Sequence, residues 1–295
     1  MDNQKFDLFK LTLLDKILGL FVPMIIIIVN SVEIHLLRKT MNKPCYEKML
    51  FSLSLSDLVS GVIAFTAVPY LAIIQDESYI ALYWIAWGFG HSYFTLSTMM
   101  HLIIIGADRL WAVGSPFHHR VHASQRKLVV TIGLSWCLPM IFIVVNIGLV
   151  LVDEMNIKMI YVYMNTTMYS VVARIVAVAD VLLVCCYSAI IYFTNTREQG
   201  VKTRKHTKQT HSISTLILCT GIMIVFIVFT TPYLTAFVII WERPQWLQSL
   251  SIYLLPFNQI CNSILYFVQQ YWRNKRPTTA SRETSQMEKT NGKFV

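Results

Sequence analysis

Seven long apolar stretches alternate with short polar segments along the chain. They cover roughly residues 17–37, 49–74, 84–107, 127–150, 167–194, 212–241 and 249–270. Each is long enough to cross the hydrocarbon core of a bilayer, which takes about 20 residues of α-helix. Backbone polar groups find no water there, so a helix that pairs them internally is expected. The pattern therefore predicts an all-α membrane protein, a bundle of seven transmembrane helices.

The composition agrees with a membrane as solvent. Hydrophobic residues make up 55% of the 295 residues and charged residues 14%, whereas about a quarter of a soluble domain is charged. We expect a short extracellular segment at 1–16, the bundle at 17–270, and a short cytoplasmic helix 8 with a disordered tail at 271–295. The segment before the first span lacks the pattern of a cleaved signal peptide, so that span is expected to insert itself.

The distribution of Lys and Arg predicts the orientation. Outside the spans these residues concentrate after the first, third, fifth and seventh spans. Few lie in the other segments: Lys5, Lys10, Lys16, Lys158 and Arg243. Cytoplasmic loops carry the positive excess, so the N-terminus is expected outside the plasma membrane and the C-terminus inside. Asn165, which begins an Asn-Thr-Thr triplet, would then be an extracellular glycosylation site.

The net charge and the cysteines narrow the function further. The charge of +9 is explained by cytoplasmic loops that face an anionic leaflet, so no nucleic-acid partner is expected. Five of the six cysteines lie within spans and Cys45 lies in the first cytoplasmic loop, so we expect no extracellular disulfide. Cys and His residues lack the spacing of a zinc site.

Few ionisable side chains lie inside the spans: Glu33, Asp57, Asp108, Arg109, Arg174 and Asp180. Each costs at least about 2.5 kcal/mol to insert, so each needs a partner or a function. Glu33 is near the inner end of its span and is expected to pair with basic loop residues. For Asp57 the candidate partners are Asn30, Asn258 and Asn262, of which the last two share one helix face. A polar centre that joins the first, second and seventh spans is predicted.

Short motifs occur in order along the spans. They are Leu53 with Asp57; Asp108-Arg109-Leu110 followed by Ala112 and Pro116; Trp136; Cys186-Tyr187; Phe226 with Pro232; and Asn258 with Asn262-Ser263-Ile264-Leu265-Tyr266. Together with seven spans and an outside N-terminus, this set resembles the rhodopsin-like (class A) G-protein-coupled receptors. The resemblance covers nearly the whole bundle.

The resemblance implies a receptor, not an enzyme. It would pass the binding of an extracellular small molecule or peptide to a heterotrimeric G protein, with arrestin and membrane lipid as further partners. Arg109 would help to hold the inactive state and would contact the G protein in the active one, with Asp108 as its local partner. The other implied members of the activation switch are Tyr187, Tyr266, Phe226 and Pro232.

The polar centre resembles a sodium site of the same family. Asp57, Thr98, Asn258 and Asn262 would supply one carboxylate and neutral oxygens, which suit a hard cation. Asn30 would complete this polar core. A hydrated cluster without an ion is the open alternative, and no cofactor other than sodium is expected.

The resemblance also places a ligand pocket between the third, fifth, sixth and seventh spans. Its candidate residues are His91, Phe94, Thr95, Arg174, Thr230 and Tyr233. His91 stands where amine receptors carry an aspartate, which disfavours a monoamine ligand, and Pro256 stands where light-sensing members carry a lysine. Arg174 could meet an acidic ligand group, or it could reach the outer surface or pair with Asp180 or Glu154.

Several positions depart from the family pattern. Thr230 stands for a tryptophan, Ala179 and Ser263 stand for prolines, and Trp84 stands for the cysteine of the outer disulfide. These departures leave a constitutive or decoy receptor as an alternative. A transporter or channel lined by the intramembrane acids is a further alternative, against which the lack of internal repeats counts. The basic segment 195–211 is expected to continue the fifth and sixth helices into the cytoplasm.

Overall fold

The computed structural model describes residues 13–39, 45–73, 77–122, 124–153, 159–160, 163–200, 209–235 and 245–275. In these residues every regular element is helical. The long helices are α1 (Leu13–Arg38), α2 (Cys45–Ile73), α3 (Glu77–Gly114), α5 (Gln125–Val152), α7 (Tyr169–Gly200), α8 (Gln209–Leu234) and α9 (Gln245–Lys275). Two short elements are α4 (Pro116–His122) and the π-helix η2 (Met164–Met168). The long helices correspond one by one to the predicted spans, which confirms the predicted fold class.

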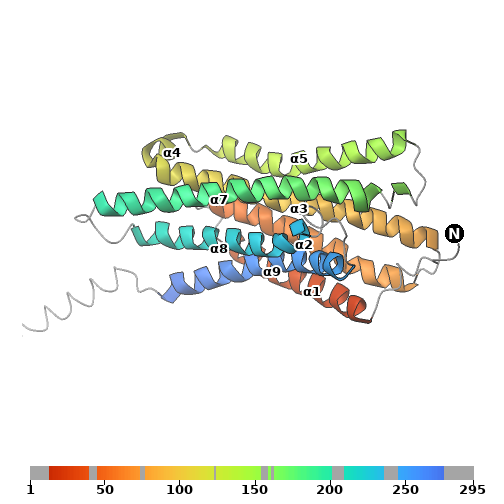
Figure 1. Ribbon diagram of the computed structural model, residues 1–295. Helices are drawn as coiled ribbons and strands as arrows, with labels where there is room; N and C mark the ends of the chain where they lie inside the picture. The colour runs from red at the N-terminus through yellow and green to blue at the C-terminus, as the bar shows by residue number, and fades with distance from the viewer. Residues whose placement is uncertain are drawn as a thin grey trace, which may run out of the picture.

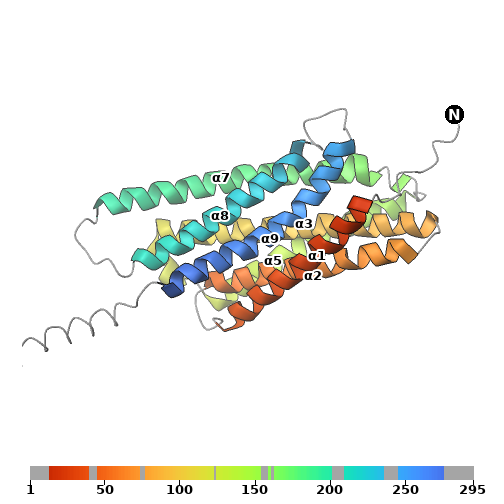
Figure 2. The same ribbon diagram turned by 90° about the horizontal axis from the view of Figure 1, so that it is seen from below.

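The long helices lie side by side in one bundle, and α1 begins at the end opposite to that at which α9 ends (Figure 1). α3 packs against α2, α5 and α7, whereas α1 packs against α2 and α9. α8 packs against α7 and α9. Seen from below, α7 and α1 lie on opposite sides of the bundle (Figure 2). α4 lies at the end where α7 ends and α8 begins (Figure 1).

The outer surface of the bundle is apolar. On α5, Val129 is 68% exposed, Val144 59% and Leu151 70%. Soluble proteins rarely expose apolar side chains over so wide an area, because water disfavours it. Within the described residues, five helices are long and apolar enough to cross a membrane, and α8 adds the shorter apolar run Thr220–Leu234. The protein is therefore a multi-pass membrane protein.

α1 and α2 approach each other closely at Gly61. A Cβ atom added there would lie 2.8 Å from Cγ2 of Ile26 on α1. Without water to drive helix association, small residues let helix backbones come close enough for van der Waals packing. This contact fixes α1 against α2 at the level where the polar centre begins, since Asn30 is one turn further along α1.

Helix 8 is not a separate element in the described residues. α9 continues without a break to Lys275, so the described part of the predicted segment 271–295 is helical and continuous with the seventh span. The reason is local: residues 267–275 contain no glycine or proline, and the first residue that ends a helix by its chemistry is Pro277. The predicted tail at 276–295 lies outside the described residues.

The helices on either side of residues 201–208 extend beyond the predicted spans. α7 continues to Gly200 and α8 begins at Gln209, which confirms the predicted continuation. Residues 201–208 between them are outside the description. The backbone of Asn165 belongs to η2, but its side chain and that of Trp84 also lie outside the described residues, so glycosylation stays a prediction.

Candidate functional site

Asp108 and Arg109 form an ion pair near the end of α3. Arg109 donates from Nε to Oδ2 of Asp108 at 3.1 Å and also from Nη2 to the same oxygen. The two side chains are only 11% and 16% exposed, with Asp108 the more sheltered. A charge-assisted pair in a sheltered place is stronger than a pair on an open surface. The guanidinium is thus held by its chain neighbour.

His119 on α4 takes the other oxygen of the same carboxylate. Its Nε2 lies 3.0 Å from Oδ1 of Asp108. α4 begins with Pro116, whose fixed φ suits the first position of a helix, and this short helix turns back against α3. His119 was not among the site residues predicted from the sequence. The signal was a histidine pair directly after Pro116 and Phe117, within reach of a chain that turns there.

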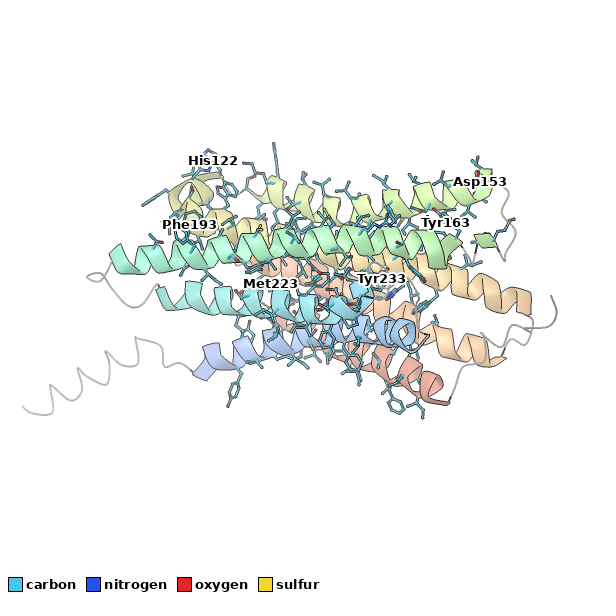
Figure 3. The ribbon with its side chains drawn as sticks, viewed as in Figure 1. His122, Asp153, Tyr163, Phe193, Met223 and Tyr233 are labelled. Carbon is cyan, nitrogen blue, oxygen red and sulfur yellow. The ribbon has the colours of Figure 1, made fainter. Side chains whose placement is uncertain are left out.

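Trp111 attaches α4 to α3. Its indole Nε1 donates to Nδ1 of His118 at 3.2 Å, and its ring meets that of His119 edge-on at 5.0 Å. The ammonium of Lys127, on α5, lies 5.7 Å from the centre of the same ring. Figure 3 shows His122 of α4 at the end of the bundle opposite to Asp153. Three helices therefore meet at the end that carries Arg109.

The other predicted switch residues lie on α7, α8 and α9. Tyr187 on α7 packs at Gly106, where an added Cβ would lie 3.4 Å from Cε2 of the tyrosine. Tyr266 on α9 accepts a hydrogen bond from Nε2 of Gln270 at 2.8 Å. Phe226 on α8 is buried, and Pro232 lies two residues before the end of that helix. The ring of Tyr187 thus meets α3 about one turn before Arg109.

Asp57 occupies the polar centre of the bundle. It is 1% exposed, and Thr98 on α3 donates to its Oδ1 at 3.2 Å. Asn262 on α9 lies beside the carboxylate. Four buried atoms have no hydrogen-bond partner among the described residues: Oδ2 of Asp57, Oδ1 of Asn258, and Oδ1 and Nδ2 of Asn262. Such a set fits a hard cation or buried water, since either would satisfy the carbonyl and carboxylate oxygens.

α1 contributes Asn30 and Glu33 to the same region through Ser263. Oγ of Ser263 lies 3.2 Å from Oδ1 of Asn30 and 2.6 Å from Oε2 of Glu33. The prediction that Glu33 pairs with basic loop residues is therefore wrong, because its side chain points into the bundle, whereas Arg38 and Lys39 on the last turn are exposed. A sequence cannot give the rotation of α1 that decides this.

A second buried polar centre was not predicted. On α3, Nε2 of His101 lies 2.9 Å from Oγ of Ser52 on α2 and 3.0 Å from Oγ of Ser135 on α5. Its Nδ1 lies 2.8 Å from the carbonyl oxygen of Ser97. Nδ1 must carry the proton, because a carbonyl can only accept. Trp136, a motif residue, donates to Oγ of Ser52 at 2.9 Å. This network joins three helices.

Three of the pocket candidates lie along α3. His91 stacks on Trp87 with ring centres 5.0 Å apart, and its Nε2 is buried without a partner among the described residues. Phe94 is buried against Tyr93, ring edge to ring face at 4.9 Å. Thr95 is buried one turn beyond His91.

The pocket candidates on α7 and α8 differ in their placement. Thr230 is fully buried and donates to Oδ2 of Asp180 at 3.1 Å. The hydroxyl of Tyr233 donates to the Tyr169 carbonyl oxygen at 3.1 Å, and Figure 3 shows this tyrosine in the interior of the bundle. Arg174 is exposed on α7, so the structure separates it from the buried candidates.

Comparison with known proteins decides the family. The model of the seven-transmembrane receptors of the rhodopsin family matches residues 34–267, which include Asp57, His101 and the Asp108–Arg109 pair. The chain belongs to the rhodopsin family. Among its curated relatives, the human D(1B) dopamine receptor is 28% identical over 97 residues, and the D(1C) dopamine receptor of Xenopus laevis is 29% identical over 98 residues.

These similarities cover part of each molecule. The matched segment is 31% of this rhodopsin-family chain and 19% and 20% of the two dopamine receptors. The D(1B) dopamine receptor of Rattus norvegicus matches to the same extent, at 29% identity over 97 residues. Members of this family are receptors and not enzymes, which agrees with the predicted class.

Proposed function

We propose that this rhodopsin-family chain transmits the binding of an extracellular ligand to a heterotrimeric G protein. Its N-terminus would lie outside the plasma membrane and its coupling surface at the end of α3. The observation that carries this proposal is the Asp108 carboxylate, held by Arg109 on one oxygen and by His119 on the other. A guanidinium held this way can be released to a partner without any covalent step.

Release of Arg109 from Asp108 to a partner protein exchanges one set of hydrogen bonds for another. The Arg109 guanidinium has five N–H donors, and its pairing with Asp108 uses two of its nitrogen atoms on a single carboxylate oxygen. A protein helix that enters this end could offer its backbone carbonyl oxygens to the guanidinium in place of the carboxylate. The surrounding basic residues favour an acidic partner surface and raise its rate of association.

An exchange assay that needs no ligand tests the coupling. Purified chain in lipid nanodiscs is mixed with purified heterotrimeric G proteins, and the rate of GDP release is measured. Asp108→Asn keeps the shape of the side chain and removes its charge, so it frees Arg109 and should accelerate GDP release. The double variant Asp108→Asn/Arg109→Ala should lose this acceleration. A folded Asp108→Asn protein that accelerates no heterotrimer would contradict the proposal.

We also propose a sodium ion at Asp57, Thr98, Asn258 and Asn262. The support is the group of buried oxygens that have no partner among the described residues. Binding to the folded state alone raises stability with ion concentration. The melting temperature in sodium should exceed that in N-methylglucamine at equal ionic strength, and Asp57→Asn should abolish the difference. Equal melting curves in both salts would mean that the site is a hydrated cluster without a sodium ion.

The ligand is expected to differ from that of the dopamine receptors. An amine ligand needs a carboxylate counter-ion, and His91 stands at the position where amine receptors carry an aspartate. Its ring stacks on the aromatic ring of Trp87. A radioligand experiment with dopamine should therefore show no saturable binding. Saturable dopamine binding to the wild type would contradict this assignment if His91→Asp strengthened that binding less than tenfold.

A further inference from the structure

The contact between α1 and α9 is made by groups that the proposed sodium site does not use. Glu33, Asn30 and Ser263 are all buried, and the two side chains from α1 meet the single hydroxyl of Ser263 on α9. Ser263 stands where the family resemblance places a proline. The position that usually weakens the helix here carries a hydrogen-bonding side chain instead.

The donors and acceptors at this contact can be counted. The Asn30 amide nitrogen donates to the carbonyl oxygen of Ile26 at 3.0 Å, so the amide oxygen, an acceptor, faces Ser263 at 3.2 Å. An ionised Glu33 would be a second acceptor, at 2.6 Å. Ser54 on α2 also lies beside Glu33, but its hydroxyl donates to the carbonyl oxygen of Leu50 at 2.9 Å. The hydroxyl of Ser263 has one proton and cannot fully serve two acceptors. If Glu33 is protonated, it donates to Ser263, Ser263 donates to Asn30, and every contact has its own proton.

The electrostatic surroundings favour the same assignment. Glu33 makes no ion pair with a basic side chain in the part of the chain that the structure describes, and the basic residues at the end of α1 are exposed. An ionised Glu33 would thus place an uncompensated negative charge in the apolar interior, which is costly at membrane depth.

We infer that Glu33 is a neutral carboxylic acid that donates its proton to Ser263 and thereby holds α9 against α1. It is a positioning residue: Tyr266 lies three residues after Ser263, so the attachment fixes the part of α9 that carries this tyrosine. The hydrogen bond is a property of the folded chain, whereas its effect on signalling rests on the proposed function.

Infrared spectroscopy tests the protonation state directly. The difference spectrum between wild type and Glu33→Gln in nanodiscs should show the loss of a carbonyl-stretch band of a protonated carboxylic acid. Asp57→Asn is the matched control, because it removes the neighbouring carboxyl group and should leave the Glu33 band in place. Loss of carboxylate bands in Glu33→Gln, with no carboxylic acid band lost, would overturn the inference.

Ser263→Ala provides a second measurement that does not alter Glu33. Without its acceptor, the carboxylic acid band should shift in frequency, as expected when a hydrogen bond is lost. An unshifted band in Ser263→Ala would show that Glu33 does not donate to Ser263. This variant removes one oxygen atom and should remain folded.

Thermal melting tests whether the two residues act as a pair. Glu33→Gln can still donate to Ser263 and should melt like wild type, whereas Glu33→Val and Ser263→Ala should each melt about 2–4 °C lower. The double variant should lose no more than the larger single loss, because both remove the same contact. Additive losses would contradict a shared hydrogen bond.

Signalling then tests the positioning role. Basal GDP release should rise severalfold in Glu33→Val and Ser263→Ala and should return to the wild-type rate in Glu33→Gln. If no variant drives exchange on any G protein, the proposed function fails while the infrared result still stands. If exchange is intact but the spectra show an ionised Glu33, the inference fails and the proposed function stands.

Discussion

Two polar regions of this protein, at the end of α3 and in the middle of the bundle, are built in different ways. At the end of α3, charged or chargeable groups close in sequence meet: Asp108 contacts its neighbour Arg109 and, eleven residues on, His119. In the middle of the bundle, groups from distant helices meet, as in the contact between Glu33 and Ser263, 230 residues apart. The first set can reform locally, whereas the second exists only when the helices are packed.

This difference follows from the solvent. At the end of a membrane-spanning helix, water and counter-ions compete with an ion pair, so it can open and close at small cost. At membrane depth no water replaces a lost partner, so a polar group there must keep its hydrogen bonds or lose considerable free energy. We therefore expect substitutions in the interior to act mainly on stability and substitutions at the α3 end to act mainly on signalling.

The largest effect is expected at His101. His101→Leu removes the imidazole that contacts serines of two other helices and should lower the free energy of unfolding by about 2–4 kcal/mol, because the Ser52 hydroxyl loses its buried acceptor and the contact with Ser135 is lost too. Thermal melting in nanodiscs measures it. His122→Leu is the matched control, since His122 is exposed on α4, and should change stability by less than about 0.5 kcal/mol. Equal losses of stability in His101→Leu and His122→Leu would contradict the expected difference between interior and surface contacts.

Arg109→Ala should reduce G-protein activation at least about tenfold, or roughly 1.4 kcal/mol, with little change in melting temperature. The guanidinium is the group that the proposal assigns to the partner. Rates of GDP release measure the loss. Arg120→Ala is the control: it removes the same charge from an exposed position on α4 and should keep most of the activity. A similar loss in both would assign the effect to net charge.

His119→Phe should raise basal GDP release about threefold, because the Asp108 carboxylate loses the partner that fixes its rotation and then holds Arg109 less firmly. A factor of three corresponds to about 0.7 kcal/mol, the usual worth of one partly exposed hydrogen bond. His118→Phe tests the ring change without the contact to Asp108. An unchanged or lower basal rate in His119→Phe would mean that His119 does not support the ion pair.

The smallest effect is expected at the exposed link between α2 and α5. The ammonium of Lys48 donates to Oε1 of Gln125 at 2.8 Å in an exposed position. Lys48→Ala should change the free energy of unfolding by less than about 0.5 kcal/mol, because water replaces the bond. Thermal melting at low and high salt checks this. A loss comparable to that of His101→Leu would remove the distinction between local surface contacts and interior ones.

Much of this arrangement was predictable from the chain. The apolar stretches gave the long helices because any span in lipid must satisfy its own backbone. The ion pair of Asp108 and Arg109 was expected because the residues are neighbours at the end of a span. The resemblance to the family rested on the same residues and is confirmed by the match over 34–267.

Other features could not be read from the sequence. His101 and Glu33 sit among apolar residues whose pattern is the same all round the helix, so no hydrophobic face shows which way they point. α9 runs on past residue 270, where the predicted seventh span ends, because no residue there breaks a helix. His119 was missed because its contact depends on the turn of α4 back toward α3.

The sequence by itself determined the elements of this protein: seven apolar spans, an acid–base pair at the end of the third, and isolated polar residues that had to be satisfied. The tertiary structure alone decided their partners. Rotation of each helix about its axis directs Glu33 to Ser263 rather than to loop residues, and gathers Ser52 and Ser135 around His101. The physical reason is that lipid imposes helix formation locally, whereas hydrogen bonds between helices depend on packing that every helix shares.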